Sequence, residues 1–309
     1  MADLSITLCG VRLPNPLILA GGILGTEAEL LARVARAGAG AVTAKSCSLQ
    51  PRAGHPNPTV LAWEHGLINA VGLANPGVEA EIEELLRAKV LLRPLGAALI
   101  ASIFADTVEH FAQVAASVVR AGPDLLEVNI SCPNVHDEFG TSFSADPGAA
   151  ADVTAAVKEA VAGATPVLVK LSPNVTDIGA IAHAVQAAGA DGITAINTLT
   201  GMVIDVHARR PVLANRSGGL SGPAIRPLAV RCVYEIYRAV DLPIIGTGGV
   251  TSGRDAVEMI LAGATAVGIG SAVYSEGPEV FCRIGAETAA LMAELGAERV
   301  EELRGAAHR

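Results

Sequence analysis

"AGAGAV" at residues 37–42 returns as AGADGI at 188–193 and as AGATAV at 262–267. In each copy a glycine follows a stretch with helical periodicity, and a short apolar run comes next. Glycine adopts the left-handed conformation that ends a helix, and the small residues after it allow a tight turn into a buried strand. AGPDL at 121–125 is a looser fourth copy. This recurring sequence motif therefore predicts a chain built from repeated helix–strand units.

Eight short apolar, β-rich runs are candidate buried strands. They are Leu17–Ala20, Ala41–Ala44, Ala97–Phe104, Leu125–Ile130, Val167–Leu171, Gly192–Ile196, Pro243–Gly246 and Ala266–Ile269. Helical periodicity lies between most of them, at Glu27–Ala37, Thr107–Ala121, Pro147–Ala162, Asp177–Ala188, Ile225–Val240, Arg254–Ala262 and Pro278–Leu295. This alternation predicts an α/β protein, a closed (β/α)₈ TIM barrel formed as a single domain by residues 1–309. A doubly wound open sheet is the alternative, because alternation alone does not prove closure.

Composition excludes several classes of protein. The chain has 309 residues, 51% of them hydrophobic, and a formal net charge of −9, which argues against disorder and against binding nucleic acid by bulk charge. Every window of about 18 residues contains a glycine, a proline or a charged residue, so no membrane span is predicted. The first twenty residues do not resemble a secretion signal, and we expect a cytoplasmic protein.

Cysteine and histidine are scattered along the chain. The five cysteines include no C-x-x-C pair, so the sequence predicts neither a disulfide framework nor an iron–sulfur or zinc site in this chain. The histidines form no grouping with metal-ligand spacing, and we predict no metal.

Two connections exceed the usual loop length. Residues 46–77 follow the second predicted strand and residues 198–224 follow the sixth. In a barrel both lie on the face that carries catalytic residues, so they are expected to act as substrate lids or subunit contacts.

Polar residues gather at the carboxyl ends of predicted strands. Lys45 follows strand 2, Asn129 ends strand 4, Lys170 lies on strand 5, and Asn197 and Thr198 follow strand 6. A buried lysine is costly without an anionic or polar partner. Together on one face of a barrel, these residues indicate a ligand site. Lys170 alone also fits a Schiff-base lysine, but that interpretation leaves the cysteine loop described below unexplained.

Glycine-rich turns follow the last two predicted strands, GTGGV at 246–250 and GIGS at 268–271. Backbone N–H groups at such turns approach phosphate oxygens closely, and this is the usual phosphate position in barrels. The spacing is not that of the dinucleotide fingerprint.

The stretch NISCPN at 129–134 places a thiol directly beyond strand 4. Pro133 disfavours a helical backbone at Cys132, so the thiol is expected in an extended loop, where it can serve as a base. The other four cysteines, Cys9, Cys47, Cys232 and Cys282, have no comparable setting and are expected to be half-buried small hydrophobes.

Several of these motifs together closely resemble class 1 dihydroorotate dehydrogenases, over residues 4–285. They are KS at 45–46, NAVGLANPG at 69–77, NISCPN at 129–134, VKLSPN at 169–174, INT at 196–198 and GGLSGP at 218–223. Within that class, NTL at 197–199, GM at 201–202, ID at 204–205 and PVLAN at 211–215 are similar to class 1B, the NAD-dependent type. The resemblance implies a catalytic subunit of pyrimidine biosynthesis that oxidises dihydroorotate to orotate with hydride transfer to FMN. Its electrons pass to NAD⁺ through a partner subunit.

The resemblance also implies site residues for one FMN per chain. Its phosphate is expected on Gly248, Gly249, Gly270 and Ser271, and its ring near Ala20, Gly21, Lys45, Ser46, Ser102, Asn129, Lys170, Ile196 and Gly222. Substrate is expected to contact Lys45, Asn69, Ala70, Val71, Gly72, Leu73, Asn129, Asn134, Asn197 and Thr198. Cys132 is expected to remove the substrate C5 proton while hydride leaves C6.

The implied roles suit the side chains. Lys170 would stabilise negative charge on the reduced flavin, and Lys45 would bind the substrate carboxylate. Amide side chains both donate and accept, as a pyrimidine edge requires. Because cysteine is a weak base at neutral pH, we expect an alkaline rate optimum. Gly21 and Ser102 depart from the family's more frequent Ser and Asn, and HDEFGT at 136–141 is not its usual glycine-rich loop.

By the same resemblance, FAD and a [2Fe–2S] cluster belong to the partner subunit, and a homodimer of this chain forms the core of a heterotetramer. The alternatives are a class 1A enzyme that uses fumarate and a dihydropyrimidine dehydrogenase-like reductase. A non-catalytic flavin-binding scaffold and a tRNA-dihydrouridine-type enzyme are further alternatives, and the acidic balance argues against the last.

Overall fold

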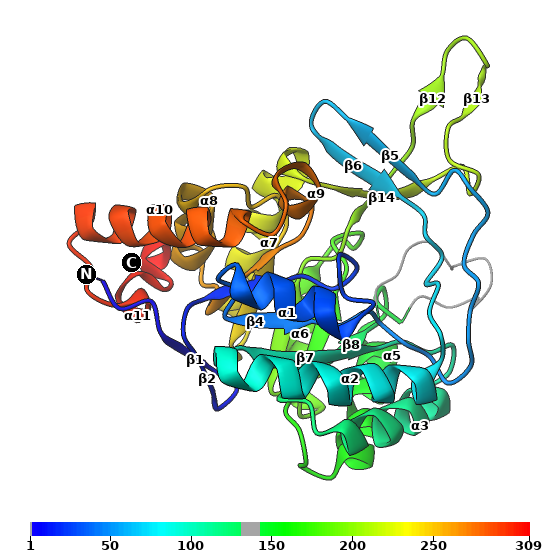
Figure 1. Cartoon of the computed structure of the whole chain (residues 1–309), viewed down its shortest axis with the longest axis horizontal. Helices are drawn as coiled ribbons and strands as arrows, with labels where there is room; N and C mark the ends of the chain where they lie inside the picture. The colour runs from blue at the N-terminus through cyan, green and yellow to red at the C-terminus, as the bar shows by residue number, and fades with distance from the viewer. Residues whose placement is uncertain (1, 131–142) are drawn as a thin grey trace.

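The computed structural model describes residues 2–130 and 143–309, and its centre is a closed barrel of parallel strands (Figure 1). In order around the barrel the strands are β3 (Leu17–Leu19), β4 (Ala41–Thr43), β7 (Ala98–Ile103), β8 (Leu125–Asn129), β9 (Val167–Leu171), β10 (Gly192–Ala195), β15 (Ile244–Thr247) and β16 (Ala266–Ile269). The last strand pairs with the first, Gly268 opposite Ile18, which closes the sheet. The predicted (β/α)₈ barrel is confirmed, and the open sheet is wrong.

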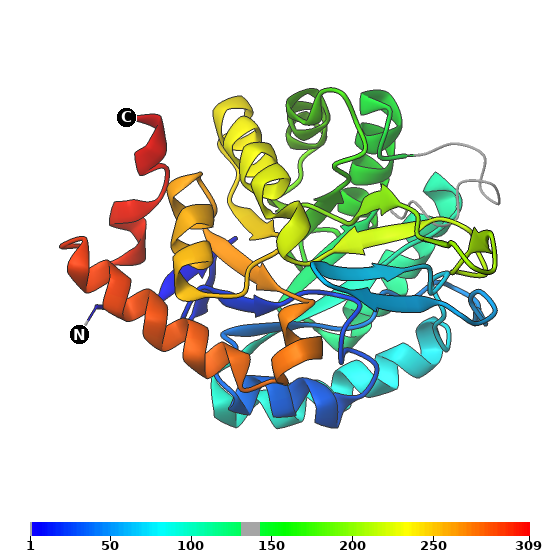
Figure 2. The same ribbon diagram turned by 90° about the horizontal axis from the view of Figure 1, so that it is seen from above.

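Helices surround the strands, as Figure 2 shows from above. They are α1 (Ala28–Arg36), α2 (Val78–Leu92), α3 (Val108–Val118), α5 (Pro147–Val161), α6 (Ile178–Ala187), α7 (Arg226–Ala239), α8 (Gly253–Leu261), α9 (Ala272–Glu276), α10 (Val280–Glu294) and α11 (Val300–Leu303). Short 3₁₀ turns are η1 (Arg93–Leu95), η2 (Val119–Ala121), η4 (Pro223–Ile225) and η5 (Ala306–His308). Several helices begin at a side chain that accepts a hydrogen bond from their own first turn, as Thr107, Asp146, Asp177 and Ser252 do. Because the barrel strands are covered on both faces, they appear in the sequence as largely apolar runs.

The recurring glycines end helices as predicted. Gly38, Gly189 and Gly263 have φ of 107°, 94° and 122°, a conformation that favours glycine. One residue later the backbone N–H donates to a carbonyl of the last helical turn, at 3.4 Å from Ala39 to Val34 and 3.0 Å from Ala264 to Met259. This local chemistry turns each helix back into the next strand.

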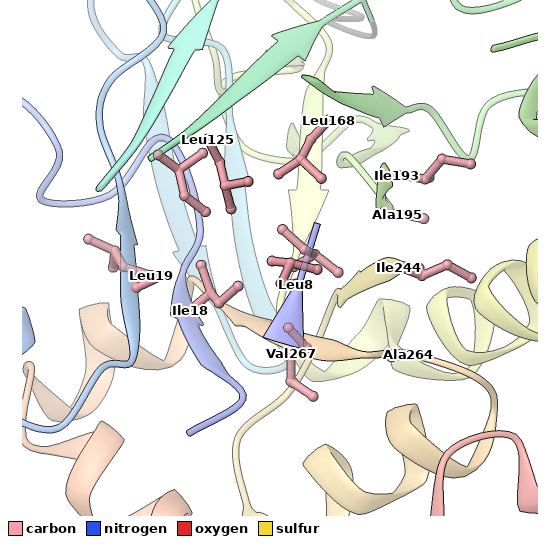
Figure 3. Close-up of a cluster of buried hydrophobic side chains, with 14 of the residues drawn as sticks. Leu8, Ile18, Leu19, Leu125, Leu168, Ile193, Ala195, Ile244, Ala264 and Val267 are labelled. Carbon is pink, nitrogen blue, oxygen red and sulfur yellow. The ribbon is translucent and has the colours of Figure 1, made fainter. Parts of the chain in front are cut away.

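The amino-terminal end of the barrel is closed by an antiparallel hairpin of β1 (Ile6–Leu8) and β2 (Val11–Leu13). Leu8 is fully buried and lies among side chains of the barrel strands, including Ile18 and Val267 (Figure 3). Both chain termini lie toward this end of the molecule (Figure 1).

The two long connections contain strands that the sequence analysis did not foresee. Four segments form one antiparallel sheet in the order β11 (Leu199–Gly201), β14 (Gly218–Ser221), β6 (Gly66–Asn69) and β5 (Val60–Trp63). The hairpin of β12 (Ile204–Asp205) and β13 (Arg210–Pro211) extends beyond it, at the end far from the termini (Figure 1). The sheet joins the two connections, because Asn69 pairs with Gly219. No helix within the described ranges has both the length and the apolar character needed to cross a membrane.

Candidate active site

A cavity of about 470 Å³ lies at the carboxyl ends of the barrel strands, within the size range of small-molecule sites. Its walls come from residues that end or follow the strands and from the antiparallel sheet above them. The lining includes Ala20, Gly21, Gly22, Lys45, Ser46, Asn69, Asn129, Lys170, Ile196, Asn197, Thr198, Ser221, Gly222, Thr247, Gly248, Gly249, Gly270, Ser271 and Tyr274. Parallel strands bring their carboxyl ends together at one edge, so side chains far apart in the sequence meet here.

Lys170 reaches the cavity from β9 and is paired with a buried carboxylate. Its Nζ lies 3.5 Å from Oε1 of Glu127, and the two side chains are 8% and 3% exposed. Ser102 Oγ donates to the same oxygen at 3.2 Å and lies 2.8 Å from Ser46 Oγ. The buried cation therefore has the anionic partner that its burial requires.

Lys45 is the second lysine of the cavity and lies two residues after the end of β4. Its backbone N–H donates to Gly25 at 2.8 Å, which fixes where the side chain begins. Behind it lies Glu81, whose pKa burial raises to about 7, with Glu84 raising it further and Lys45 lowering it. Two cations thus face one cavity, and both have a glutamate nearby.

Amide side chains form one corner of the site. Asn197 Nδ2 donates to Asn129 Oδ1 at 3.3 Å, and Asn197 Oδ1 accepts from the Thr198 backbone at 2.8 Å. Asn174 supports this corner from outside, because its Nδ2 donates to the Thr198 carbonyl at 3.1 Å and its Oδ1 accepts from the Thr200 backbone at 2.9 Å. The corner offers both donors and acceptors on a fixed backbone.

The loop at 69–73 forms another part of the cavity wall, and side chains outside the cavity contact its backbone. Arg52 Nε donates to the Gly72 carbonyl at 2.8 Å, and His55 Nδ1 lies 3.1 Å from the Ala70 carbonyl. Asn75 ends the loop by accepting from the Gly77 backbone at 2.9 Å and donating to the Leu73 carbonyl at 2.9 Å. These contacts set the shape of the loop before any ligand binds.

The glycine turns after β15 and β16 are suited to hold a phosphate. Gly248 and Gly249 have φ of 138° and 74°, and a Cβ added to either would lie 2.7 Å from Ala229 Cβ or Arg226 Cβ respectively. Only backbone fits there, and exposed backbone N–H groups are good phosphate ligands. Within the described part of the chain, the buried Thr247 Oγ1 beside them has no hydrogen-bond partner. A cavity with this turn at one side and Lys170 at another fits a flavin nucleotide.

Most predicted site residues line this cavity. Those that do are Ala20, Gly21, Lys45, Ser46, Asn69, Val71, Gly72, Leu73, Asn129, Lys170, Ile196, Asn197, Thr198, Gly222, Gly248, Gly249, Gly270 and Ser271. Ala70 does not, because its side chain packs with Ile68 and Leu213 in a separate apolar cluster. Ser102 lies beneath Ser46 and reaches the cavity only through that side chain. Cys132 and Asn134 lie outside the described residues.

Sequence reasoning missed several residues that shape the site. Glu127 is the sole acidic residue of its strand, and a lone carboxylate in an apolar run was a usable signal. Thr247 lies within the predicted phosphate turn, but the sequence analysis gave it no role. Asn174 belongs to a motif that the sequence already singled out, but its bond to the Thr198 carbonyl depends on the fold. Tyr274 had no signal, because it lies on the short helix α9.

Cys47 and Cys232 are buried and Cys9 is half-buried, which fits the expectation of small, at least half-buried hydrophobes, whereas Cys282 is exposed and does not fit it. Burial raises the pKa of Cys9 to about 12 and that of Cys232 to about 11, and it raises the pKa of Cys47 further. These three thiols therefore stay protonated at neutral pH. Among the residues that the structure describes, no three of His, Cys, Asp and Glu gather as a metal site would require.

Comparison with known proteins gives consistent matches along the chain. The family model described as dihydroorotate dehydrogenase matches residues 3–292. A protein of Methanosarcina mazei is 47% identical over 99% of this chain and 95% of its own length. A protein of Methanothermobacter thermautotrophicus is 48% identical over 99% of this chain and 98% of its own, and one of Methanocaldococcus jannaschii is 45% identical over the same shares. All three are named dihydroorotate dehydrogenase B (NAD(+)), catalytic subunit.

Proposed function

The chain belongs to the dihydroorotate dehydrogenase family, and on that premise we propose that it is an FMN-dependent catalytic subunit that oxidises dihydroorotate to orotate. Relatives 43–48% identical carry the name of the NAD⁺-linked type. NAD⁺ is accordingly the final electron acceptor, and the reaction belongs to de novo pyrimidine synthesis.

The observation that carries this proposal is the pair of lysines in one cavity. Lys170 and Lys45 both line it, together with the amides of Asn69, Asn129 and Asn197. The cavity is therefore suited to an occupant that carries negative charge and has a ring edge with alternating donors and acceptors. A reduced flavin and a carboxylated dihydropyrimidine meet these requirements together.

FMN, when bound, supplies a ring that takes up a hydride from the substrate. The chain's own residues do the rest. Lys170 stabilises the charge that the ring gains, and the backbone at Gly248, Gly249 and Gly270 binds the phosphate. Lys45 binds the substrate carboxylate, while the corner of Asn197 and Thr198 orients the ring. By the family resemblance, Cys132 takes the substrate proton.

The partner is a separate subunit that carries FAD and a [2Fe–2S] cluster, and the chain itself dimerises at the core of a heterotetramer. Support for this part comes from the relatives, which are named catalytic subunits.

Lys45 favours dihydroorotate over the competing substrates uracil and thymine, because neither of those has a carboxylate. A dihydropyrimidine reductase would not need a cation at the position of Lys45.

An anaerobic titration of the purified chain tests this function. We expect bound flavin whose visible absorbance bleaches with dihydroorotate but not with dihydrouracil. The bleached flavin should stay reduced with NAD⁺ alone, because the partner subunit is missing. It should recover slowly or not at all with fumarate, which is the acceptor of the class 1A alternative. A colourless chain, or a flavin untouched by dihydroorotate, would contradict the proposal.

A further inference from the structure

Glu127 is a buried carboxylate that the proposed chemistry does not use. It lies on β8 opposite Ser102 of β7 in the sheet register, and two residues before Asn129, which pairs with Lys170 of β9. Side chains at registered positions of neighbouring strands point to the same face, and positions two apart along a strand do so as well. Glu127 therefore points into the barrel, one layer beneath the amide of Asn129.

Two neighbours hold this carboxylate in one place. Oε1 lies 3.5 Å from Lys170 Nζ and accepts from Ser102 Oγ at 3.2 Å. Because Ser102 gives its only hydroxyl proton to Glu127, the 2.8 Å contact between the two serines must use the proton of Ser46. Ser46 consequently offers lone pairs to the cavity.

The carboxylate also lies close under the cavity floor. A Cβ built on Gly21 would be 3.4 Å from Glu127 Oε1, and Gly21 itself lines the cavity. With no side chain at this position, only backbone separates the negative charge from the space above. At such short range and low solvent exposure, one charge acts strongly on an occupant.

From these contacts we propose that Glu127 is a positioning residue that fixes the Lys170 ammonium and offsets part of its charge toward the flavin. The proposal rests on the proposed function, since it assumes that a flavin occupies the cavity. Removing the carboxylate should leave the cavity more positive, so that the flavin binds added negative charge more readily. If Glu127 had a purely structural role, its substitution would change the stability of the protein and leave the flavin's affinity for added negative charge unchanged.

Sulfite is a suitable probe, because its adduct with oxidised flavin carries negative charge and bleaches the visible absorbance. The experiment compares sulfite affinity in the FMN-loaded wild type, Glu127→Gln, Lys170→Met and the double variant. We expect Glu127→Gln to bind sulfite about tenfold more tightly than wild type, the effect of one charge near a partly buried site. The double variant should also exceed Lys170→Met, but by a smaller factor, because without the ammonium only the direct effect of the carboxylate charge remains.

The second comparison keeps the test valid if Glu127→Gln alone does not fold. The double variant removes both charges of the pair, and an uncharged pair is tolerated better in a protein interior than a single unpaired charge. Asp191→Asn is the matched control. It also removes a carboxylate paired with a lysine, 2.6 Å from Lys158, but Asp191 directly precedes β10, at the amino-terminal end of the strand. Its sulfite affinity should equal that of the wild type.

The outcomes separate the two proposals. Unchanged or weaker sulfite binding in both glutamine-containing variants, in chains that hold flavin, would overturn the role of Glu127 alone. A wild-type chain that takes up no FMN would contradict the proposed function and this inference together.

Discussion

The two ends of the barrel are built from the same strands but from opposite kinds of side chain. At the amino-terminal end the β1–β2 hairpin fills the opening with Leu8 and Leu13, both fully buried. At the carboxyl end the strands place Ser102, Glu127 and Lys170 in the interior, where they are 1%, 2% and 7% exposed. The difference teaches that one end of the barrel supplies stability and the other, at the cost of buried polar groups, supplies chemistry.

Leu8→Ala removes a buried apolar side chain at the amino-terminal end of the barrel, and we expect the largest effect on stability from this variant. The side chain is fully buried among barrel residues, so its truncation should lower the free energy of unfolding by about 2–5 kcal/mol. Urea unfolding measures the loss. Flavin affinity of the folded fraction should not change, and a parallel fall in flavin affinity would show that the two ends are not independent.

Glu81→Gln tests whether buried polar groups at the carboxyl end of the barrel lower stability. We expect this variant to be more stable than the wild type. The folded-state pKa of about 7 lies above the ordinary value of 4.5, so the protonated carboxyl stabilises the fold fully below about pH 4.5. That stability is lost as pH rises through about 7. Glutamine does not titrate, and the variant should be more stable than wild type by up to about 3 kcal/mol near pH 8.

Urea unfolding of Glu81→Gln and wild type at several pH values provides the check. The difference between the two proteins should grow from pH 4.5 to pH 7 and then level off. An equal difference at all pH values would show that Glu81 does not titrate in this range.

Gly249→Ala tests the phosphate turn. Its φ of 74° disfavours alanine, and the new Cβ would lie 2.7 Å from both Arg226 Cβ and the Gly222 carbonyl. We expect FMN affinity to fall at least about tenfold, because the turn must shift. Gly163→Ala is the matched control, with φ of 79° and nothing within 4 Å of its Cβ. It carries the same backbone cost, about 1 kcal/mol, and should keep its flavin.

Asn174→Ala should have the smallest effect. It removes the support of the Thr198 and Thr200 backbone, so we expect the apparent affinity for dihydroorotate to fall by roughly fivefold to tenfold. Asn15→Ala removes a similar support at the apolar end, where Asn15 bonds the Gly38 carbonyl and the Leu17 backbone. Both variants should lose about 1 kcal/mol of stability, and an equal loss of substrate affinity in both would contradict the comparison.

The barrel could be predicted from the sequence because its signals are local. In each copy of the repeat, the glycine after the helix and the apolar run that follows lie within six residues, and Gly38, Gly189 and Gly263 adopt the expected conformation. The position of the cavity could also be predicted, because polar residues at strand ends such as Lys45 and Asn129 must meet in a closed barrel.

The antiparallel sheet above the barrel could not be predicted in this way. Its central pair joins Asn69 to Gly219, and nothing in either segment identifies the other. The strands are short, and β14 begins with two glycines, which weakens any strand pattern. Glu127 was missed for a related reason, because its partner Lys170 lies on the next strand and only the register brings the two together.

The most direct test of the account is the affinity of the flavin-loaded chain for orotate and for uracil, measured by flavin absorbance in wild type and Lys45→Met. The central claim is that the polar end binds a carboxylated pyrimidine beside a flavin. It predicts that the substitution weakens orotate binding about a hundredfold and leaves uracil binding nearly unchanged. Equal effects on both ligands, or none on orotate, would contradict it.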